Sequence, residues 1–100
     1  MKKQGFTYIM ANDRPTLYAG SSSNLIQRVY QHKNGLVDGR FTKKYKLHKL
    51  VYYESFNTIM EAIMRERQIK DMNREEKLDM IKKINPNLED LYGKILDKPE

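Results

Sequence analysis

The chain has 100 residues, of which 39% are hydrophobic and 32% charged, and it contains no cysteine. This length suits one domain with a modest core. The apolar runs are too short to span a bilayer and no basic-then-apolar signal segment opens the chain, so we expect a cytoplasmic protein with no membrane partner. The lack of cysteine excludes disulfides, thiolate metal sites and cysteine nucleophiles.

The net charge is +6 at pH 7 and the sequence pI is about 9.5. A small basic domain favours polyanions, first of all DNA and RNA, although many such domains bind nothing specific. Positive charge is concentrated between residues 28 and 49, where Asp38 is the only acid and three aromatic residues are interleaved. The candidate nucleic-acid contacts in this segment are Arg28, Lys33, Arg40, Lys43 and Lys44.

The N-terminal region predicts a β-hairpin. Residues 6–11, FTYIMA, are rich in the residue types of strands, residues 12–15 have the composition of a turn, and residues 16–20, TLYAG, form the returning strand. If the loop is symmetric about Asp13, Tyr8 and Tyr18 lie opposite each other. Both phenols then point to the same face of the sheet.

A helix is predicted over residues 24–33, NLIQRVYQHK. Serines 21–23 are candidate N-caps, and Gly35 can end the helix in a left-handed conformation.

On this helix Leu25, Arg28, Val29 and His32 share one face. An arginine that can grip a phosphate and a histidine that can move protons near neutral pH therefore interrupt an apolar stripe. The alternative is a solvated arginine beside Leu25 and a histidine that caps the helix end.

The rest of the chain alternates a loop, a strand and two helices. We expect a loop over residues 36–45 and a third strand over residues 47–56. Capping boxes at Thr58–Glu61 and Asn73–Glu76 open helices that run to about residues 72 and 84.

Asn85-Pro86 ends the last helix, after which the tail is expected to pack through Leu88, Leu91 and Tyr92 and then fray. The order β-β-α-β-α-α predicts the α/β (α+β) class, with a small three-stranded sheet flanked by helices. Residues 1–84 would form the single domain and residues 85–100 a partly packed C-terminal extension.

Glu66 lies on the apolar face of the helix predicted from residue 58. Ile59, Ala62, Ile63 and Ile69 follow a core-facing stripe, and Glu66 falls on it between the last two. A carboxylate at such a position is costly unless something pairs with it. Two interpretations remain open, a structural ion pair with a lysine or arginine and a ligand for a cation.

Together these residues suit phosphodiester hydrolysis. Glu66 would hold a divalent cation, Arg28 would stabilise charge on the phosphate, and a tyrosine or a water on the metal would handle the nucleophile's proton. Other chemistries fit less well, because the sequence has no glycine-rich phosphate loop, HExxH motif, Cys/His cluster or serine elbow.

The segments FTYIM, LYAG, NLIQRVYQH and EAIMRERQIK occur in this order over roughly residues 5–84. This arrangement resembles the GIY-YIG nuclease domain of the excision-repair subunit UvrC and of certain homing endonucleases. It is most similar to small stand-alone bacterial UvrC-like (YazA/YhbQ-like) proteins. The resemblance implies a three-stranded antiparallel sheet with helices around it and cleavage of one DNA strand through a single Mg²⁺ or Mn²⁺.

By this resemblance the name-giving triplets fall at residues 6–8 and 18–20, and Tyr8 or Tyr18 would be the general base. Arg28 matches the phosphate-contacting arginine, His32 the auxiliary histidine or tyrosine, and Glu66 the metal-binding glutamate. The catalytic set implied is Tyr8, Tyr18, Arg28, His32 and Glu66.

The chain departs from the family pattern at two places. Some members carry a lysine just after the second triplet, where this chain has Ser21 and Ser22. The late asparagine of the family has three candidate counterparts, Asn73, Asn85 and Asn87.

These observations predict a monomeric, metal-dependent endonuclease that acts on DNA, with structure-selective nicking in repair or recombination as the finer expectation. The main alternative is a non-catalytic DNA- or RNA-binding module with the same fold. A protein-interaction domain that uses the basic middle segment is a third.

Overall fold

Three antiparallel strands form the centre of the molecule in the computed structural model, which describes residues 3–36 and 44–97. The strands, in the spatial order β2-β1-β3, are β1 (Gly5–Ala11), β2 (Leu17–Ser22) and β3 (Lys49–Phe56). The helices of the described residues are α1 (Leu25–Lys33), α3 (Ile59–Asp71), α4 (Arg74–Ile84) and α5 (Tyr92–Leu96). The predicted fold class and element order are confirmed, and the short α5 is an addition to them.

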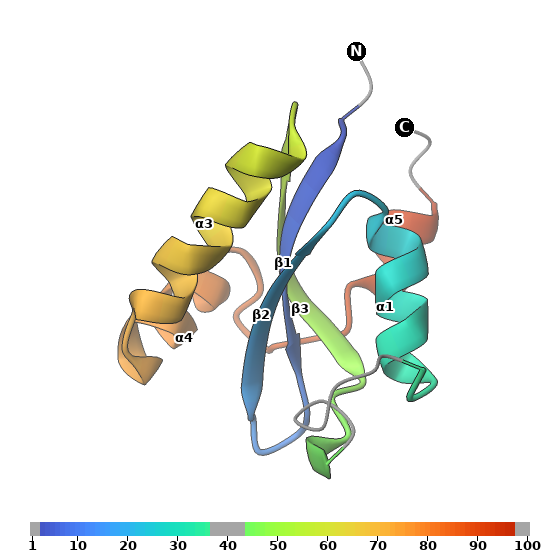
Figure 1. Ribbon diagram of the computed structural model, residues 1–100. Coiled ribbons are helices and arrows are strands. Elements are labelled where there is room, and N and C mark those ends of the chain that lie inside the picture. The colour runs from blue at the N-terminus through green and yellow to red at the C-terminus, as the bar shows by residue number, and fades with distance from the viewer. Residues whose placement is uncertain (1–2, 37–43, 98–100) are drawn as a thin grey trace.

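Helices cover both faces of the sheet, α1 and α5 on one face and α3 and α4 on the other (Figure 1). The central strand β1 is therefore buried along all seven residues, which explains why its sequence is a nearly continuous apolar run. None of the helices described is both long and apolar enough to cross a membrane.

Alternation along β1 divides the core into two clusters. Phe6, Tyr8 and Met10 pack toward α1 and α5, whereas Ile9 and Ala11 pack toward α3 and α4. The sheet thus presents a separate set of side chains to each helical layer.

The hairpin register differs from the expected one. Tyr8 pairs with Gly20, and Tyr18 pairs with Met10, so the prediction that the two tyrosines lie directly opposite each other is wrong. They still share a face, because Tyr8 and Met10 are two residues apart on one strand.

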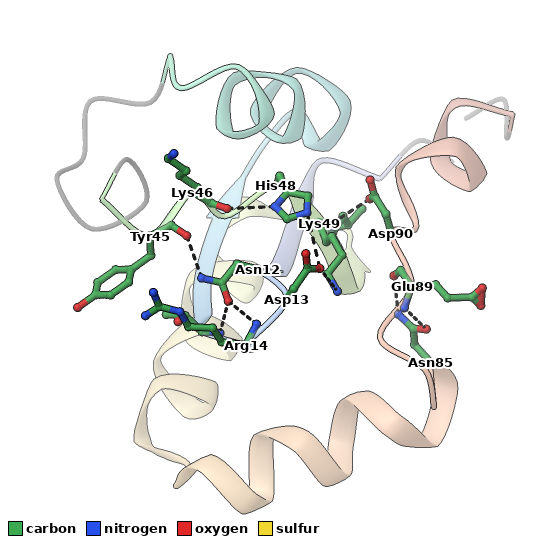
Figure 2. Close-up of polar contacts among 12 residues, drawn as sticks. Asn12, Asp13, Arg14, Tyr45, Lys46, His48, Lys49, Asn85, Glu89 and Asp90 are labelled. Atoms are coloured by element: carbon green, nitrogen blue, oxygen red, sulfur yellow. Dashed lines mark hydrogen bonds and ion pairs between the residues drawn. The ribbon is translucent and has the colours of Figure 1, made fainter.

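The side chain of Asn12 explains this register. Its Oδ1 accepts hydrogen bonds from the backbone N–H groups of Arg14, at 3.1 Å, and Thr16, at 2.7 Å. These bonds close a loop over residues 12–16 that is centred on Arg14, one residue later than expected. Its Nδ2 donates to the Tyr45 carbonyl at 2.8 Å, which ties the hairpin tip to the chain before β3 (Figure 2).

Two local expectations about helices need correction. Asn24, not a serine, caps α1 by accepting from the N–H of Gln27, while Ser21 and Ser22 extend β2. Ile59 was expected in the core, but it is 39% exposed. The backbone of this first turn of α3 lies directly against Gly5 of β1, where a Cβ would be 2.4 Å from the Thr58 carbonyl oxygen.

Most other local signals are confirmed. Both predicted capping boxes are formed, at Thr58–Glu61 and Asn73–Glu76. Gly35 follows α1 with φ +66°, the left-handed conformation that ends the helix.

Residues 85–92 run along the outer edge of β3. The N–H of Leu91 donates to the Leu50 carbonyl at 2.7 Å, and Asp90 Oδ1 accepts from the Leu50 N–H at 3.0 Å. Buried Asn85 donates to the carbonyl of Val51, the extra residue of a bulge between β1 and β3, at 3.0 Å. The C-terminal segment therefore satisfies the outward backbone groups of Leu50 and the carbonyl of Val51 at this edge.

Candidate active site

The strand β2 lies at the other edge of the sheet, between α1 and α3. Its alternation directs Tyr18 and Gly20 toward the α1 layer and Ala19 and Ser21 toward the α3 layer. Gly20 leaves room for the ring of Tyr8, because a Cβ at this position would lie 2.5 Å from the phenol oxygen. This short strand thus contributes to both halves of the candidate site, an α1 half around Tyr8 and His32 and an α3 half around Glu66.

The α1 half of the site is built around a tyrosine–histidine pair. Tyr8 Oη and His32 Nε2 are 2.9 Å apart, and the ring of Tyr18 lies 5.6 Å from that of His32. Leu25, Val29 and His32 are buried and Arg28 is partly buried, so the predicted face of the helix is confirmed.

Burial keeps this pair neutral at neutral pH. It lowers the pKa of His32 to about 4, and the charge of Arg28 acts in the same direction. It raises the pKa of Tyr8 well above its ordinary value, helped by Tyr18 and Glu66 and opposed by the charge and hydrogen bonding of Arg28. His32 is therefore a neutral hydrogen-bonding group near pH 7 rather than a cation.

The remaining ring nitrogen of His32, Nδ1, is buried and has no hydrogen-bond partner among the residues described. The imidazole is 6% exposed and Tyr8 is 2% exposed. As the hydrogen-bond partner of Tyr8 in a buried environment, His32 fixes the orientation of the phenol.

The α3 half of the site is built around Glu66, whose side chain is 19% exposed. Its Oε1 accepts a hydrogen bond from Ser21 Oγ at 2.5 Å, and its Oε2 pairs with Lys70 Nζ at 2.6 Å. The ion pair that the sequence left open is thus present. Neither Ser21 nor Lys70 was predicted as a partner of Glu66, although strand alternation already places Ser21 on the opposite face from Tyr18.

The two halves meet around the outer edge of β2. Tyr8, Tyr18 and His32 lie on the α1 side, while Glu66 lies on the α3 side. They are nevertheless close, because Lys70 Nζ, which is paired with Glu66, lies 5.9 Å from the ring centroid of Tyr18. The site therefore wraps the outer edge of β2.

A divalent cation fits this arrangement through one carboxylate. Mg²⁺ is bound in proteins by one or two carboxylates, keeps several waters and takes substrate phosphate oxygens as further ligands. Within residues 3–36 and 44–97 no cluster of three or more histidine, aspartate or glutamate side chains could enclose a metal ion. Glu66, half-buried and held at one oxygen by Ser21, is the group of this site that could hold such an ion.

The candidate nucleic-acid contacts outside the site are placed unevenly. Arg40 and Lys43 lie outside the described residues, and Lys44 is exposed near the hairpin tip. Lys33 forms an ion pair with Asp90 and donates to the His48 carbonyl at 2.8 Å. This geometry favours a structural role for Lys33, and its contact with nucleic acid stays a prediction.

The three candidate asparagines lie elsewhere. Asn85 is 4% exposed and is bonded to Val51 and Glu89 at the β3 edge, opposite the edge that carries Glu66. Asn73 caps α4, and Asn87 is exposed beyond the end of that helix. The structure gives Asn73 and Asn85 local structural roles.

Comparison with known proteins extends over most of the chain. Residues 4–79 match the model of the GIY-YIG catalytic domain. The chain is 36% identical over 83 residues to a UPF0213 protein of Syntrophus aciditrophicus, covering 83% of this chain and 94% of that protein. It is 38% identical over 76 residues to a UPF0213 protein of Staphylococcus epidermidis, covering 76% and 92%. No solved structure matches the chain significantly.

Proposed function

The chain belongs to the GIY-YIG catalytic-domain family, and on this premise we propose that it is a metal-dependent endonuclease that hydrolyses a phosphodiester bond in DNA. The observation that carries the proposal is that Tyr18 and Glu66 are joined through Lys70 at one sheet edge. The ring of Tyr18 also lies 5.6 Å from that of His32, one turn after Arg28 on α1. A phenol, a guanidinium and a carboxylate are the groups needed to move a proton, stabilise phosphate charge and hold a cation.

Exposure separates the roles of the two tyrosines. A residue that exchanges a proton with the nucleophile must come within hydrogen-bond reach of it. Tyr18 is partly exposed, whereas Tyr8 is 2% exposed and bonded to His32. We therefore assign proton transfer to Tyr18 and the positioning of the α1 half of the site to the Tyr8–His32 pair.

The charged residues act on the phosphate. The guanidinium of Arg28 can grip two phosphate oxygens and stabilise the charge that develops during hydrolysis. Glu66 would hold Mg²⁺ or Mn²⁺, and the bound ion would supply Lewis-acid stabilisation of the phosphate. Ser21 orients the carboxylate for this task through its hydrogen bond to Oε1.

The substrate class follows from size and charge. A basic chain of 100 residues favours a polyanion but offers little surface to read a long sequence. We therefore propose nicking of DNA according to its structure, in repair or recombination, by a monomer in the cytoplasm.

One observation favours a non-catalytic DNA-binding module as the second candidate. Glu66 is already paired with the ammonium of Lys70, which supplies positive charge without a metal. A domain in which this pair is permanent would bind the phosphate backbone and leave it intact.

Incubation of the purified protein with supercoiled plasmid and Mg²⁺ or Mn²⁺ tests the proposal. We expect nicked circles from the wild type and a loss of about 100-fold or more in Glu66→Gln, which keeps the shape of the side chain but not its charge. Glu75→Gln, on the exposed side of α4, is the matched control and should nick normally.

Nicking that survives Glu66→Gln would reject the assigned site. If the wild type binds DNA but leaves plasmid and branched substrates intact with both metals, the binding module is the correct function.

A further inference from the structure

The Glu66–Lys70 pair differs from ordinary pairs on the surface of a helix. Glutamate four residues before lysine is a common exposed pair that contributes little. Here the carboxylate is 19% exposed and also accepts from Ser21, while the lysine side chain is 50% exposed. One partner is thus anchored in the site and the other is at its rim.

The ammonium of Lys70 also lies where the two halves of the site meet. It is 2.6 Å from Glu66 Oε2, in the α3 half, and 5.9 Å from the ring centroid of Tyr18, in the α1 half. Tyr18 and Ser21, the hydrogen-bond partner of Glu66, point to opposite faces of the sheet, so Lys70 reaches around the outer edge of β2 to approach both Tyr18 and Glu66. A phosphate that contacts Arg28 and Tyr18 would pass this ammonium.

We propose that Lys70 is an exchangeable counter-ion of the site, which holds Glu66 in the free protein, yields it to a divalent cation and then contacts a phosphate of the bound strand. The inference rests on the proposed function for the identity of its ligands. It assigns to Lys70 the second cationic contact, across the β2 edge from Arg28.

The exchange is physically easy. A half-exposed ion pair is weak, so a divalent ion that is attracted to the same carboxylate can displace the ammonium. The lysine stem is flexible and can redirect its charge over several ångströms. Ser21 bonds to the other carboxylate oxygen, so Glu66 keeps its orientation while Lys70 moves.

The first test measures metal binding alone. We would titrate Mn²⁺ into the full chain without DNA and follow the paramagnetic broadening of the Glu66 resonances in the wild type, Lys70→Met and Lys83→Met. Lys83 lies on the exposed side of α4, and Lys83→Met is the control because it changes the net charge by the same amount as Lys70→Met. Removal of the competing ammonium should tighten Mn²⁺ binding by about threefold to tenfold in Lys70→Met relative to Lys83→Met. Equal affinities would overturn the proposal.

The second test measures the phosphate contact through salt dependence. We would plot log affinity for duplex DNA against log salt concentration, a line whose steepness reports the number of phosphate contacts. With Ca²⁺ present, the line for Lys70→Met should be less steep than that of the wild type, by the amount expected for about one phosphate contact. With EDTA the slope should equal that of Lys83→Met, because Lys70 is then held by Glu66. In a Glu66→Gln background, Lys70→Met should reduce the slope even with EDTA. If Lys70→Met reduces the slope equally with Ca²⁺ and with EDTA, or does not reduce it at all, the proposed exchange is contradicted.

These readouts are independent of cleavage. Nicking by the wild type together with equal Mn²⁺ affinities would reject the role of Lys70 and leave the proposed function intact. Tighter Mn²⁺ binding in Lys70→Met and a cation-dependent slope, without nicking by any variant, would support the exchange and reject the nuclease.

Discussion

The sheet ends in β3 on one side and in β2 on the other, and different groups cover these two edges. At β3, the N–H of Leu91 and the carboxylate of Asp90 satisfy the carbonyl and the N–H of Leu50. The side-chain amide of Asn85 satisfies the carbonyl of Val51. At β2, no backbone hydrogen bond joins the outer edge to another segment among the residues described. Side chains from α1 and α3 meet there instead.

An uncovered strand edge is a template for pairing with other chains, and proteins protect such edges with a covering segment or with charged side chains. This molecule uses the first solution at β3 and the second at β2, where Glu66 and Lys70 lie. The difference shows why the site can form where it does. The segment over residues 85–92 stabilises the fold at β3, and no backbone segment of the described residues covers the edge of β2 where the proposed DNA substrate would bind.

Removal of the covering segment should have the largest effect. A chain that ends at Ile84 loses Leu91 and Ile95 from the core together with the bonds to β3. This amounts to about 5 kcal/mol or more, comparable to the whole free energy of unfolding of a small domain. We expect no cooperative thermal transition by circular dichroism. A cooperative transition close to that of the full chain would show that residues 1–84 are a complete domain.

Asn85→Ala should weaken the β3 edge more gently. The variant loses hydrogen bonds to the carbonyls of Val51 and Glu89 and to the N–H of Glu89, in a residue that is 4% exposed. We expect the free energy of unfolding in urea to fall by about 3 kcal/mol, with DNA affinity unchanged. Asn87→Ala, at an exposed position, should change it by no more than about 0.5 kcal/mol. Equal changes in the free energy of unfolding for Asn85→Ala and Asn87→Ala would contradict the structural role of the Asn85 hydrogen bonds.

At the β2 edge, Gly20→Ala tests the close approach of Tyr8. The added methyl group would lie 2.5 Å from the phenol oxygen, so Tyr8 must shift and its bond to His32 must lengthen. We expect a loss of about 2 kcal/mol in the free energy of unfolding, from overpacking. Gly93→Ala, where nothing lies within 4 Å, should be neutral or slightly stabilising. Equal stability of the two variants would show that Tyr8 is not constrained by β2.

The smallest effect concerns pH and His32. Its pKa is about 4 in the folded protein and 6.5 in the unfolded chain, so the unfolded state binds more protons between these values. The free energy of unfolding should therefore fall with decreasing pH through this window, by about 1 kcal/mol between pH 7 and pH 5.5. His32→Asn should remove this component, whereas His48→Gln, at an exposed position, should keep it. Parallel pH profiles for the wild type and His32→Asn would contradict the burial of a neutral imidazole.

Local patterns in the sequence were sufficient for much of the fold. The capping boxes at Thr58 and Asn73 and the glycine after α1 predicted helix boundaries to within a residue or two, because caps depend on neighbours three or four residues away. The centre of the hairpin was predicted one residue too early, at Asp13 instead of Arg14. Asn12 extends the loop through bonds to Arg14 and Thr16, and pattern alone does not show which turn geometry a flexible segment adopts.

The sequence by itself determined which residues of α1 share a face and that Glu66 interrupts an apolar stripe, since helical and strand periodicity place side chains relative to their own element. Only the tertiary structure decided that Ser21 and Lys70 hold Glu66, that the site wraps the β2 edge, and that residues 85–92 close the β3 edge. Ser21 and Glu66 are 45 residues apart. Such contacts depend on which strand becomes an edge and which helix covers each face, and these are properties of the whole packed chain.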